Sequence, residues 1–413
     1  MSAMKKTASV STLPQEIFME ILSKLPAKTL VRFRCVSKFF RALIADHGFG
    51  VLHRSLSLTL PSRASFLISI EVRTRDGDDP PRRGYYTLNF SEQENLRCRR
   101  MLRANRVGFL DSEPFLLSSP SDGLICASKP NGDVTVRNVG TRQRIFLPRL
   151  NQYQGEDSAL LLGFDSQSKR YKVLMSVQIV DEESRLISYE YKHWVFTVGV
   201  DRSWREINNY CYCPFFPIGD YPHCDYNNTN VYIDGVIYSY NWRTNHSLVP
   251  SVVAFEVGCE SFSVIILPDE ITSRSSYLLF KKSALLEVGG RLAIVFVHVP
   301  DLLDILRGGE CLCYMDVWTW EKSKKFWEKI TITIPSAGSR LIHNVKWMRF
   351  ATNHDGEIML LLYTYSENFS ILIYNLKCEA WSKFDISGVE KFQIFSSWKV
   401  TLHNIVDHVF PLE

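Results

Sequence analysis

The sequence predicts a mainly β chain, in which a small N-terminal α-helical unit precedes a β-propeller of about six blades. Three observations support this prediction. Apolar residues follow a helical period most clearly between Leu13 and Ile44. Beyond residue 60, short alternating apolar stretches are separated by Gly, Asn, Asp and Ser turns. Two local patterns then recur at intervals that suit four-stranded blades.

The length and composition indicate a globular chain with more than one core. At 413 residues, the chain exceeds what a single core usually supports. Its hydrophobic content of 46% and aromatic content of 13% allow a large buried apolar area. We therefore expect a disordered tail over residues 1–12, a helical unit over 13–55 and the propeller over 56–413.

The net charge of +4 is distributed unevenly along the chain. Residues 1–60 hold nine Lys and Arg against three acidic residues, so this segment carries +6 and the remainder carries −2. So small a total argues against a dedicated nucleic-acid-binding protein, and we expect no nucleic-acid partner.

The N-terminal residues 1–10 contain no apolar run that could act as a signal peptide, and no later window holds ~18 uninterrupted apolar residues. We expect a cytoplasmic and/or nuclear protein without a membrane partner. The ten cysteines show no regular spacing, which favours reduced and mostly buried thiols over a disulfide framework.

The N-terminal pattern predicts three short helices. Pro14 suits the first turn of a helix, where its missing N–H is not needed. Pro26 ends this helix, a second is expected over residues 28–36 with Leu30 and Phe33 inward, and Ser37 is a suitable N-cap for a third. The apolar positions of the first helix are Ile17, Phe18, Ile21, Leu22 and Leu25.

A unit of this size buries too little surface to be stable alone. Leu13, Ile17, Ile21 and Leu25 form a wider apolar stripe than three short helices can cover. Burial of each such side chain contributes ~1.5–3 kcal/mol before association costs are subtracted. The stripe therefore predicts a protein partner for the helical unit.

The same segment resembles an F-box. Leu13-Pro14 and Leu25-Pro26 stand twelve residues apart, residues 32–38 read Arg-Phe-Arg-Cys-Val-Ser-Lys, and Leu43-Ile44 follow. Phe40 stands where the family usually has tryptophan. The resemblance implies binding to a Skp-family adaptor and, through it, to a cullin. The positions it implies as adaptor-facing are Leu13, Pro14, Ile17, Leu25, Pro26 and Leu30.

Two other interpretations of the unit remain. It could be a small helical bundle with no such partner. It could also be a helix-turn-helix that contacts nucleic-acid phosphates. The basic residues that this second interpretation would use are Arg32, Arg34, Lys38 and Arg41, although basic helix faces are usually only solvated.

Two patterns recur in the body of the chain. The first is a turn followed by a strand, in which glycine supplies a positive φ. It occurs at residues 122–125, 234–237, 289–292 and 355–358. The second is an aromatic residue that opens a strand, at Trp204, Phe262, Trp327 and Trp381, with spacings of 58, 65 and 54 residues. A period of this length is similar to that of kelch-like propeller blades.

The ring is expected to close between segments far apart in the sequence. Residues 134–148 and 160–177 supply blades with weaker patterns, and Ser65–Phe90 supplies a degenerate sixth blade. The C-terminal strand Lys399–Val406 would pair with this last blade. The body also resembles the F-box-associated domain of plant proteins, through landmarks in the family's order at residues 138–141, 147–148, 171–173, 235–238, 255, 260, 262, 267–268, 292–293 and 317–318.

The sequence lacks the motifs of several common enzyme classes. It contains no P-loop, dinucleotide-binding glycine pattern, His-Glu-x-x-His pair or Gly-x-Ser-x-Gly elbow, so we expect no catalytic residues and no cofactor. Propeller hydrolases can hold carboxylates in dispersed loops, so a hydrolase remains an alternative.

Two clusters allow a second interpretation. Cys211, Cys213, His223 and Cys224 are residue types that can hold zinc, but Cys-x-Cys on one strand face is also typical of buried thiols, and we predict no metal. The five arginines within residues 96–106 could bind nucleic acid, but they also suit a solvated face.

We therefore expect a substrate-recognition subunit of an SCF-type ubiquitin ligase, in which the propeller binds an unknown protein substrate. Alternatives are a non-degradative F-box complex and a nucleic-acid-binding propeller. Residues 210–226 form a long connection rich in aromatics and proline, a composition typical of binding loops. Within it we expect Phe215, Phe216 and Tyr221 to contact the substrate. These rings could instead pack beneath their own loop.

Overall fold

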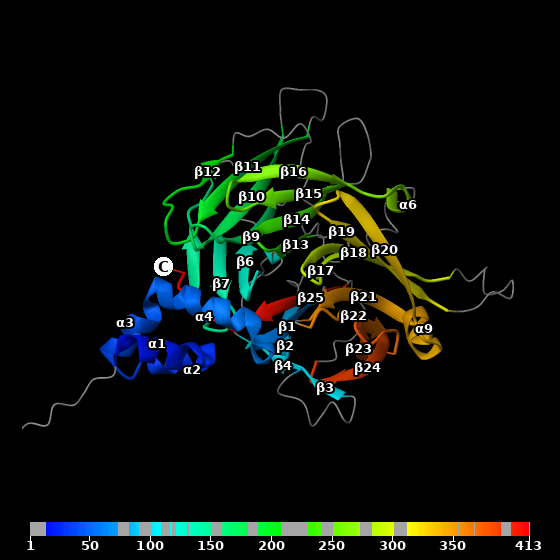
Figure 1. Cartoon of the computed structure of the whole chain (residues 1–413), viewed down its shortest axis with the longest axis horizontal. Coiled ribbons are helices and arrows are strands. Elements are labelled where there is room, and N and C mark those ends of the chain that lie inside the picture. Colours follow the sequence, from blue (N-terminus) through cyan, green and yellow to red (C-terminus); the bar gives the residue numbers. More distant parts are fainter. Residues whose placement is uncertain are drawn as a thin grey trace, which may run out of the picture.

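Strands dominate the chain and form six sheets arranged around a ring (Figure 1). This computed structural model describes residues 14–72, 82–90, 101–108, 116–117, 121–129, 132–150, 158–180, 189–207, 230–241, 251–272, 283–300, 312–353, 355–366, 368–389 and 398–412. The predicted fold class, a small helical unit followed by a six-bladed β-propeller, is confirmed.

Four helices precede the first strand, and we call them the helical head. They are α1 (Gln15–Ser23), α2 (Ala27–Phe33), α3 (Lys38–Ala45) and α4 (His47–Thr59), followed by the short 3₁₀ helix η1 (Pro61–Arg63). Pro14 lies at the N-cap of α1, close to the first-turn position that was expected, and Pro26 follows the end of α1 as predicted and is also the N-cap of α2. The Ser37 hydroxyl accepts a hydrogen bond from the Phe40 N–H, which confirms its predicted role as an N-cap.

The fourth helix was not predicted. Gly48 and Gly50 within α4 weaken its intrinsic helix propensity. Asp46 caps its first turn by accepting the Phe49 N–H at 3.0 Å. Its buried face includes His53 and Arg54, which contact other parts of the molecule, so tertiary contacts stabilise this helix.

The six blades each contain four strands, with one exception. Blade 1 contains β25 (Trp398–Val406), β1 (Ala64–Val72), β2 (Arg82–Leu88) and β4 (Asn105–Arg106). Blade 2 contains β5 (Leu116–Leu117), β6 (Leu124–Ser128), β7 (Val134–Asn138) and β8 (Arg144–Leu147). Blade 3 contains β9 (Ser158–Asp165), β10 (Arg170–Val180), β11 (Tyr189–Thr197) and β12 (Arg205–Glu206).

Blades 4 to 6 continue in chain order. Blade 4 contains β13 (Asn230–Ile233), β14 (Val236–Asn241), β15 (Ser251–Glu256) and β16 (Ser261–Ile266). The helix α6 (Asp269–Thr272) leads to blade 5, which contains β17 (Ser283–Val288), β18 (Arg291–His298), β19 (Tyr314–Glu321) and β20 (Phe326–Thr333). After α9 (Ser336–His343), blade 6 contains β21 (Val345–Thr352), β22 (Ile358–Thr364), β23 (Phe369–Asn375), β24 (Ala380–Ser387) and the additional strand β3 (Met101–Arg103).

The ring closes where the sequence predicts. Strand β25 pairs antiparallel with β1 along its full length, from Ala64 opposite Val406 to Val72 opposite Trp398. The structure also shows a second closure that was not predicted. Strand β3 adds to the outer edge of blade 6, in parallel with β24. The chain then continues directly into β4 of blade 1. Blades 6 and 1 are therefore connected at their outer strands, in addition to the pairing of β25 with β1.

The predicted turn pattern is also confirmed. Asp234 and Gly235 adopt positive φ values of 42° and 82° between β13 and β14, as a tight hairpin requires. At Gly123, φ is 90° and the Val406 carbonyl lies so close that a Cβ would collide with it. This turn therefore needs glycine for both its backbone conformation and its contact with the closing strand.

Three of the four recurring aromatic residues join neighbouring blades. The indole N–H of each donates to a backbone carbonyl at the outer edge of the preceding blade. The pairs are Trp204 with Pro148 at 2.6 Å, Trp327 with Ile266 at 2.9 Å and Trp381 with Thr333 at 3.0 Å. We call these hydrogen bonds the indole bridges, and they explain why an aromatic residue recurs where the last strand of a blade begins.

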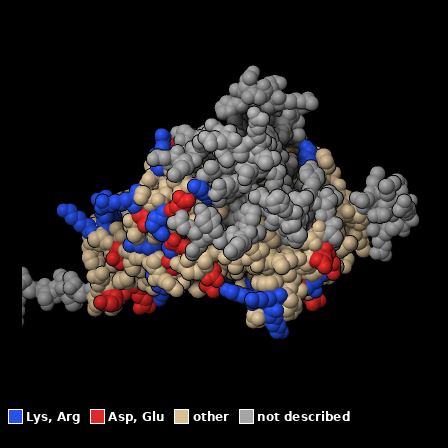
Figure 2. All heavy atoms as spheres, turned by 90° about the horizontal axis from the view of Figure 1, so that it is seen from above, with Lys and Arg blue, Asp and Glu red and all other residues tan. Residues whose placement is uncertain are grey.

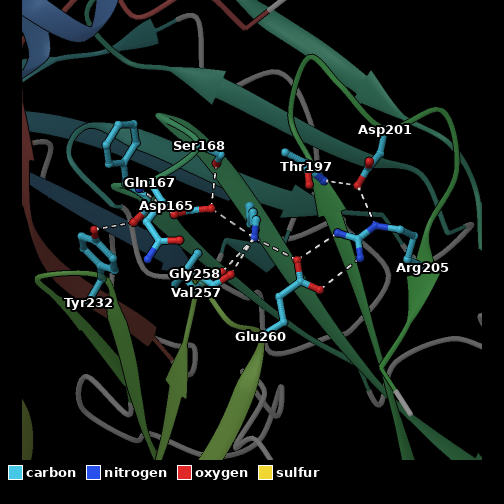
Figure 3. A network of polar contacts seen from close by, with 12 residues as sticks. Asp165, Gln167, Ser168, Thr197, Asp201, Arg205, Tyr232, Val257, Gly258 and Glu260 are labelled. Carbon is cyan, nitrogen blue, oxygen red and sulfur yellow. Dashed lines mark hydrogen bonds and ion pairs between the residues drawn. The ribbon is translucent and has the colours of Figure 1, made fainter. Parts of the chain in front are cut away.

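Charged side chains join blades 3 and 4 (Figure 3). The Lys172 ammonium lies 3.2 Å from Asp165 and 2.9 Å from Glu260, and it also donates to the Val257 carbonyl. Arg205 donates two hydrogen bonds to Glu260. Burial raises the pKa of Glu260, but Arg205 and Lys172 outweigh it and lower the pKa overall. The carboxylate is therefore held ionised and neutralised, which suits a structural role.

Candidate functional site

An exposed apolar stripe lies on α1. Ile17 and Ile21 are four residues apart, so they occupy one face of the helix, and they are 40% and 52% exposed. Pro14, at the start of the same helix, is also exposed. Large aliphatic side chains gathered on one face of a small helical unit are typical of a protein-binding surface.

The other predicted adaptor-facing residues lie in different environments. Pro26 is exposed and Leu25 is half-buried, whereas Leu30 is fully buried in the core of the helical head. Leu13 lies outside the described residues. The surface open to a partner therefore includes Pro14, Ile17 and Pro26, and Leu30 supports it from within.

The sequence reasoning did not identify two further exposed residues in the helical head. Val36, between α2 and α3, is 68% exposed, and Phe39 on α3 is 46% exposed. The ring of Phe39 packs edge-on against Phe18 of α1 at 5.4 Å, so it extends the apolar surface from α1 to α3. An apolar pair that flanks the N-cap Ser37 is the signal that could have found them.

Phe40 keeps the helices together at the position where the resemblance implies tryptophan. Its ring centroid lies 5.9 Å from Phe18 and 5.5 Å from Phe33, both in edge-to-face geometry. Below this cluster, the head has its own core of Leu22, Ala27, Leu30, Leu43, Ile44, Phe49 and the C-terminal Val409. The C-terminal segment thus completes the core of the N-terminal unit.

The head is fixed to the propeller by a buried ion pair. Arg54 of α4 binds the Asp122 carboxylate at the turn that precedes β6, and both side chains are almost fully buried. The guanidinium also donates to the Tyr171 hydroxyl at 2.9 Å and stacks 3.6 Å from the centre of the Phe164 ring. Three blade residues therefore enclose one arginine of the head.

The C-terminal segment adds a second set of contacts between the head and the propeller. The Ala27 N–H at the start of α2 donates to Asp407 at 2.8 Å. Phe410 packs in the core shared by blades 2 and 3, and Pro411 lies where a Cβ on Gly50 of α4 would collide with it. These contacts fix the orientation of the helical head relative to the ring (Figure 1).

The surface charge of the head is mixed. Figure 2 shows blue and red side chains interspersed at the end of the molecule that carries the head. Arg32, Lys38 and Arg41 are exposed, while Arg34 is partly buried. A mixed surface of this kind gives no specific support to the helix-turn-helix interpretation.

Several predicted residues lie outside the described residues. These are the substrate-binding candidates Phe215, Phe216 and Tyr221, the zinc candidates Cys211, Cys213, His223 and Cys224, and the arginines Arg97, Arg99 and Arg100. In the part of the chain that the structure describes, no group of three or more His, Cys, Asp or Glu could hold a metal ion. None of the described helices is long and apolar enough to cross a membrane.

The described cysteines differ in part from expectation. Cys126 and Cys313 are buried free thiols, whereas Cys35, Cys259 and Cys378 are exposed free thiols. Burial raises the pKa of Cys126 to about 12, so this thiol is unreactive at neutral pH. The expectation that most thiols are buried therefore does not hold for the described cysteines.

Comparison with known proteins identifies two matching regions. Residues 10–52 match the F-box domain, and residues 82–409 match the F-box associated beta propeller domain. The F-box protein At4g19940 of Arabidopsis thaliana is 23% identical over 422 residues, which cover 99% of this chain and 94% of that protein. The F-box/LRR-repeat protein At2g40920 of the same plant is 26% identical over 382 residues, which cover 90% and 80%.

Among solved structures, the SapL1 lectin in complex with α-methyl fucoside aligns with a TM-score of 0.39 at 10% identity, over 80% of this chain and 97% of the lectin.

Proposed function

The chain belongs to the plant F-box proteins with an F-box-associated β-propeller domain, and from this premise we propose that it is a non-catalytic substrate receptor of an SCF-type ubiquitin ligase. The helical head binds a Skp-family adaptor and, through it, a cullin. The propeller holds a protein substrate near the ubiquitin-conjugating enzyme. The receptor contributes proximity, which raises the effective concentration of the substrate lysine.

The observation that carries this proposal is the exposed apolar stripe of Ile17 and Ile21 on a head that is fixed to the ring. Apolar side chains that are exposed in the free protein and become buried on binding supply most of the energy of an interface. The buried Arg54–Asp122 pair keeps the head from turning freely, so an adaptor bound to α1 has a defined orientation relative to the blades.

The adaptor interface is tested with the variant Ile17→Asp/Ile21→Asp. Both side chains are exposed, so the fold should persist, while two charges desolvated at an interface should reduce affinity for a plant Skp-family adaptor by about a hundred-fold or more. Affinity is measured by calorimetry with purified adaptor. The matched control is Ile330→Asp on β20 of the propeller, where Ile330 is 47% exposed.

Two results decide between outcomes. Unchanged adaptor affinity in the α1 variant, together with an unchanged melting curve, would contradict the proposed interface. If the parent binds the adaptor but the half-life of a captured substrate is the same with and without the receptor, the alternative of a non-degradative complex is favoured.

For the substrate side, we propose that Phe215, Phe216 and Tyr221 make contact with the substrate. Aromatic side chains bury much area with few rotamers to freeze, which supports this assignment. Alanine at all three positions should abolish capture of the substrate while adaptor binding stays unchanged. Equal recovery of the same substrate by mass spectrometry would place its binding surface elsewhere.

A further inference from the structure

A cleft of about 600 Å³ opens between blades 4 and 5. One wall is the edge of β16 with the strands behind it, and the other is formed by β19, β20 and the turn that joins them. Both blades lie on the side of the ring away from the helical head (Figure 1). A volume of this size is typical of sites for small organic ligands, which commonly range over ~300–1,000 Å³.

The blade 5 wall of the cleft is aromatic. Trp318, Trp320 and Trp327 line it, and the rings of Trp320 and Trp327 lie 5.2 Å apart. Trp327 is held in place because its indole N–H donates to the Ile266 carbonyl across the cleft. Tyr238 and Ile265 face these rings from blade 4. Preformed aromatic surfaces of this kind bind planar apolar groups at low entropic cost.

The mouth of the cleft is basic on one side. Lys322 and Lys325 come from the turn between β19 and β20, and both are exposed and line the cleft. Neither ammonium group forms an ion pair with any residue in the described ranges. Glu256 lies on the opposite wall and contributes one negative charge. The Lys322 and Lys325 side therefore complements an anionic group.

The corresponding cleft between blades 5 and 6 differs in both respects. Its volume is about 300 Å³, and it is lined by a single tryptophan, Trp381. Its lysine, Lys383, lies 3.1 Å from the Asp385 carboxylate and is therefore already paired. The combination of several indoles with unpaired ammonium groups is thus a property of the blade 4–5 cleft and not of the repeat itself.

We propose that the blade 4–5 cleft binds a low-molecular-weight ligand that joins a planar apolar body to an acid group. The body lies against Trp318 and Trp320, and the acid group lies at Lys322 and Lys325. This site is separate from the adaptor surface, and its existence does not depend on the proposed ligase role.

The probe for this proposal is 8-anilinonaphthalene-1-sulfonate, which carries fused rings and one sulfonate. N-phenyl-1-naphthylamine has the same rings without the acid group and serves as the neutral comparison. Both are titrated by fluorescence against the full chain. All proteins carry Ile17→Asp/Ile21→Asp, so that the apolar stripe of α1 does not add a second binding site.

Charge reversal is the central variant. Lys322→Glu/Lys325→Glu should lower the affinity for the sulfonate probe by about ten-fold and change the affinity for the neutral probe by less than about two-fold. Glutamate is compatible with the backbone at residue 325, where φ is 54°, because Glu260 and Glu379 occupy the same turn position in blades 4 and 6 with φ values of 55° and 51°. The matched control is Lys377→Glu in the equivalent turn of blade 6, and it should change neither affinity.

Two further variants separate the walls of the cleft. Trp320→Leu keeps an apolar side chain but removes the ring, so it should weaken both probes. Glu256→Gln removes the opposing charge and should tighten the sulfonate probe by about two-fold. The proposal is overturned if the sulfonate probe shows no saturable site, if charge reversal leaves its affinity unchanged, or if Lys377→Glu has an equal effect.

Discussion

His53 joins the helical head to the C-terminal segment through both of its ring nitrogens. Its Nε2 lies 2.9 Å from the Leu25 carbonyl and can donate to it, while Nδ1 accepts from the Val409 N–H at 3.4 Å. This arrangement requires the neutral imidazole, because a protonated Nδ1 has no lone pair for Val409. Burial lowers the pKa of His53 from 6.5 to about 4; the hydrogen bond to Leu25 opposes this shift, and the nearby Arg63 cation contributes to it.

The depressed pKa predicts a loss of stability in mild acid. Unfolded His53 binds a proton as the pH falls below about 6.5, whereas the folded chain resists protonation until about pH 4. The contribution of His53 to the free energy of unfolding is therefore fully present above pH 6.5. It falls by about 1.4 kcal/mol per pH unit between pH 6.5 and pH 4. Urea unfolding at pH 7 and pH 5 should show a difference of about 2 kcal/mol from His53.

The matched variant is His53→Gln, which retains a donor for Leu25 but does not titrate in this range. It should be less stable than the parent at pH 7 and should show a shallower fall towards pH 5. Because His193 and His408 also have pKa values lowered to about 4 by burial, some acid sensitivity should remain. An identical pH slope in both proteins would show that His53 already titrates normally in the folded chain.

At the scale of single elements, the indole bridges connect blades 3, 5 and 6 to the blades that precede them. The bridges differ in exposure, since the Trp204 bond to Pro148 is partly buried while the Trp327 bond to Ile266 is exposed. A partly buried carbonyl that loses its donor is less readily hydrogen-bonded by water than an exposed one. The same substitution should therefore have unequal effects at the two positions.

Trp204→Phe and Trp327→Phe retain a ring and remove the N–H. We expect a loss of about 1–3 kcal/mol at Trp204, where Pro148 is left unsatisfied, and about 1 kcal/mol or less at Trp327. Both are measured by chemical unfolding of the full chain. Equal losses, or a larger loss at Trp327, would mean that ring packing and not the hydrogen bond sets the cost.

How far the sequence predicts these elements depends on whether the signal is local. The turn at Asp234 and Gly235 and the N-cap at Ser37 depend on adjacent residues, so they could be recognised directly. The role of the indole N–H could not be recognised from the sequence, because the carbonyl that accepts from it lies in another blade. Helix α4 and strand β3 were missed for the same reason, since both are stabilised by segments distant in the sequence.

The candidate site shows the same limit. The sequence places Pro14 at the start of the first helix and Pro26 after its end, and the helical period places Ile17 on an outer face. Leu30 lies in the core of the head, as its inward position in the pattern of residues 28–36 predicts, whereas the resemblance implies an adaptor-facing position. The blade 4–5 cleft was not foreseen, because its walls come from strands of two different blades.

At the scale of the whole molecule, the C-terminal residues close the ring and complete the head. Strand β25 supplies the missing strand of blade 1. The following residues then cross to the head, where Val409 joins its core and Asp407 binds the start of α2. Folding of the ring and placement of the head are therefore coupled through one short segment, and the two roles can be separated by truncation.

The last prediction compares two truncations. Deletion of residues 397–413 removes β25 and leaves β1 with an unpaired edge, so we expect aggregation or loss of a cooperative melt. Deletion of residues 408–413 retains β25 and the Asp407 contacts but removes Val409 and Phe410. This shorter deletion should leave a soluble, cooperatively melting ring of lower stability, because the core of the head loses Val409 and the core of blades 2 and 3 loses Phe410 and Leu412.

Hydrogen exchange distinguishes the two roles in the shorter deletion. Amides of α1 to α3 should exchange at least about ten-fold faster than in the parent, while amides of blades 5 and 6, whose hydrophobic cores include none of residues 408–413, should be unchanged. Unchanged exchange in α1 to α3 would show that the Arg54–Asp122 pair and the retained Ala27–Asp407 hydrogen bond are sufficient to hold the head. Faster exchange throughout the ring would show instead that Phe410 is required for closure, because loss of its packing between blades 2 and 3 would then open the ring as a whole.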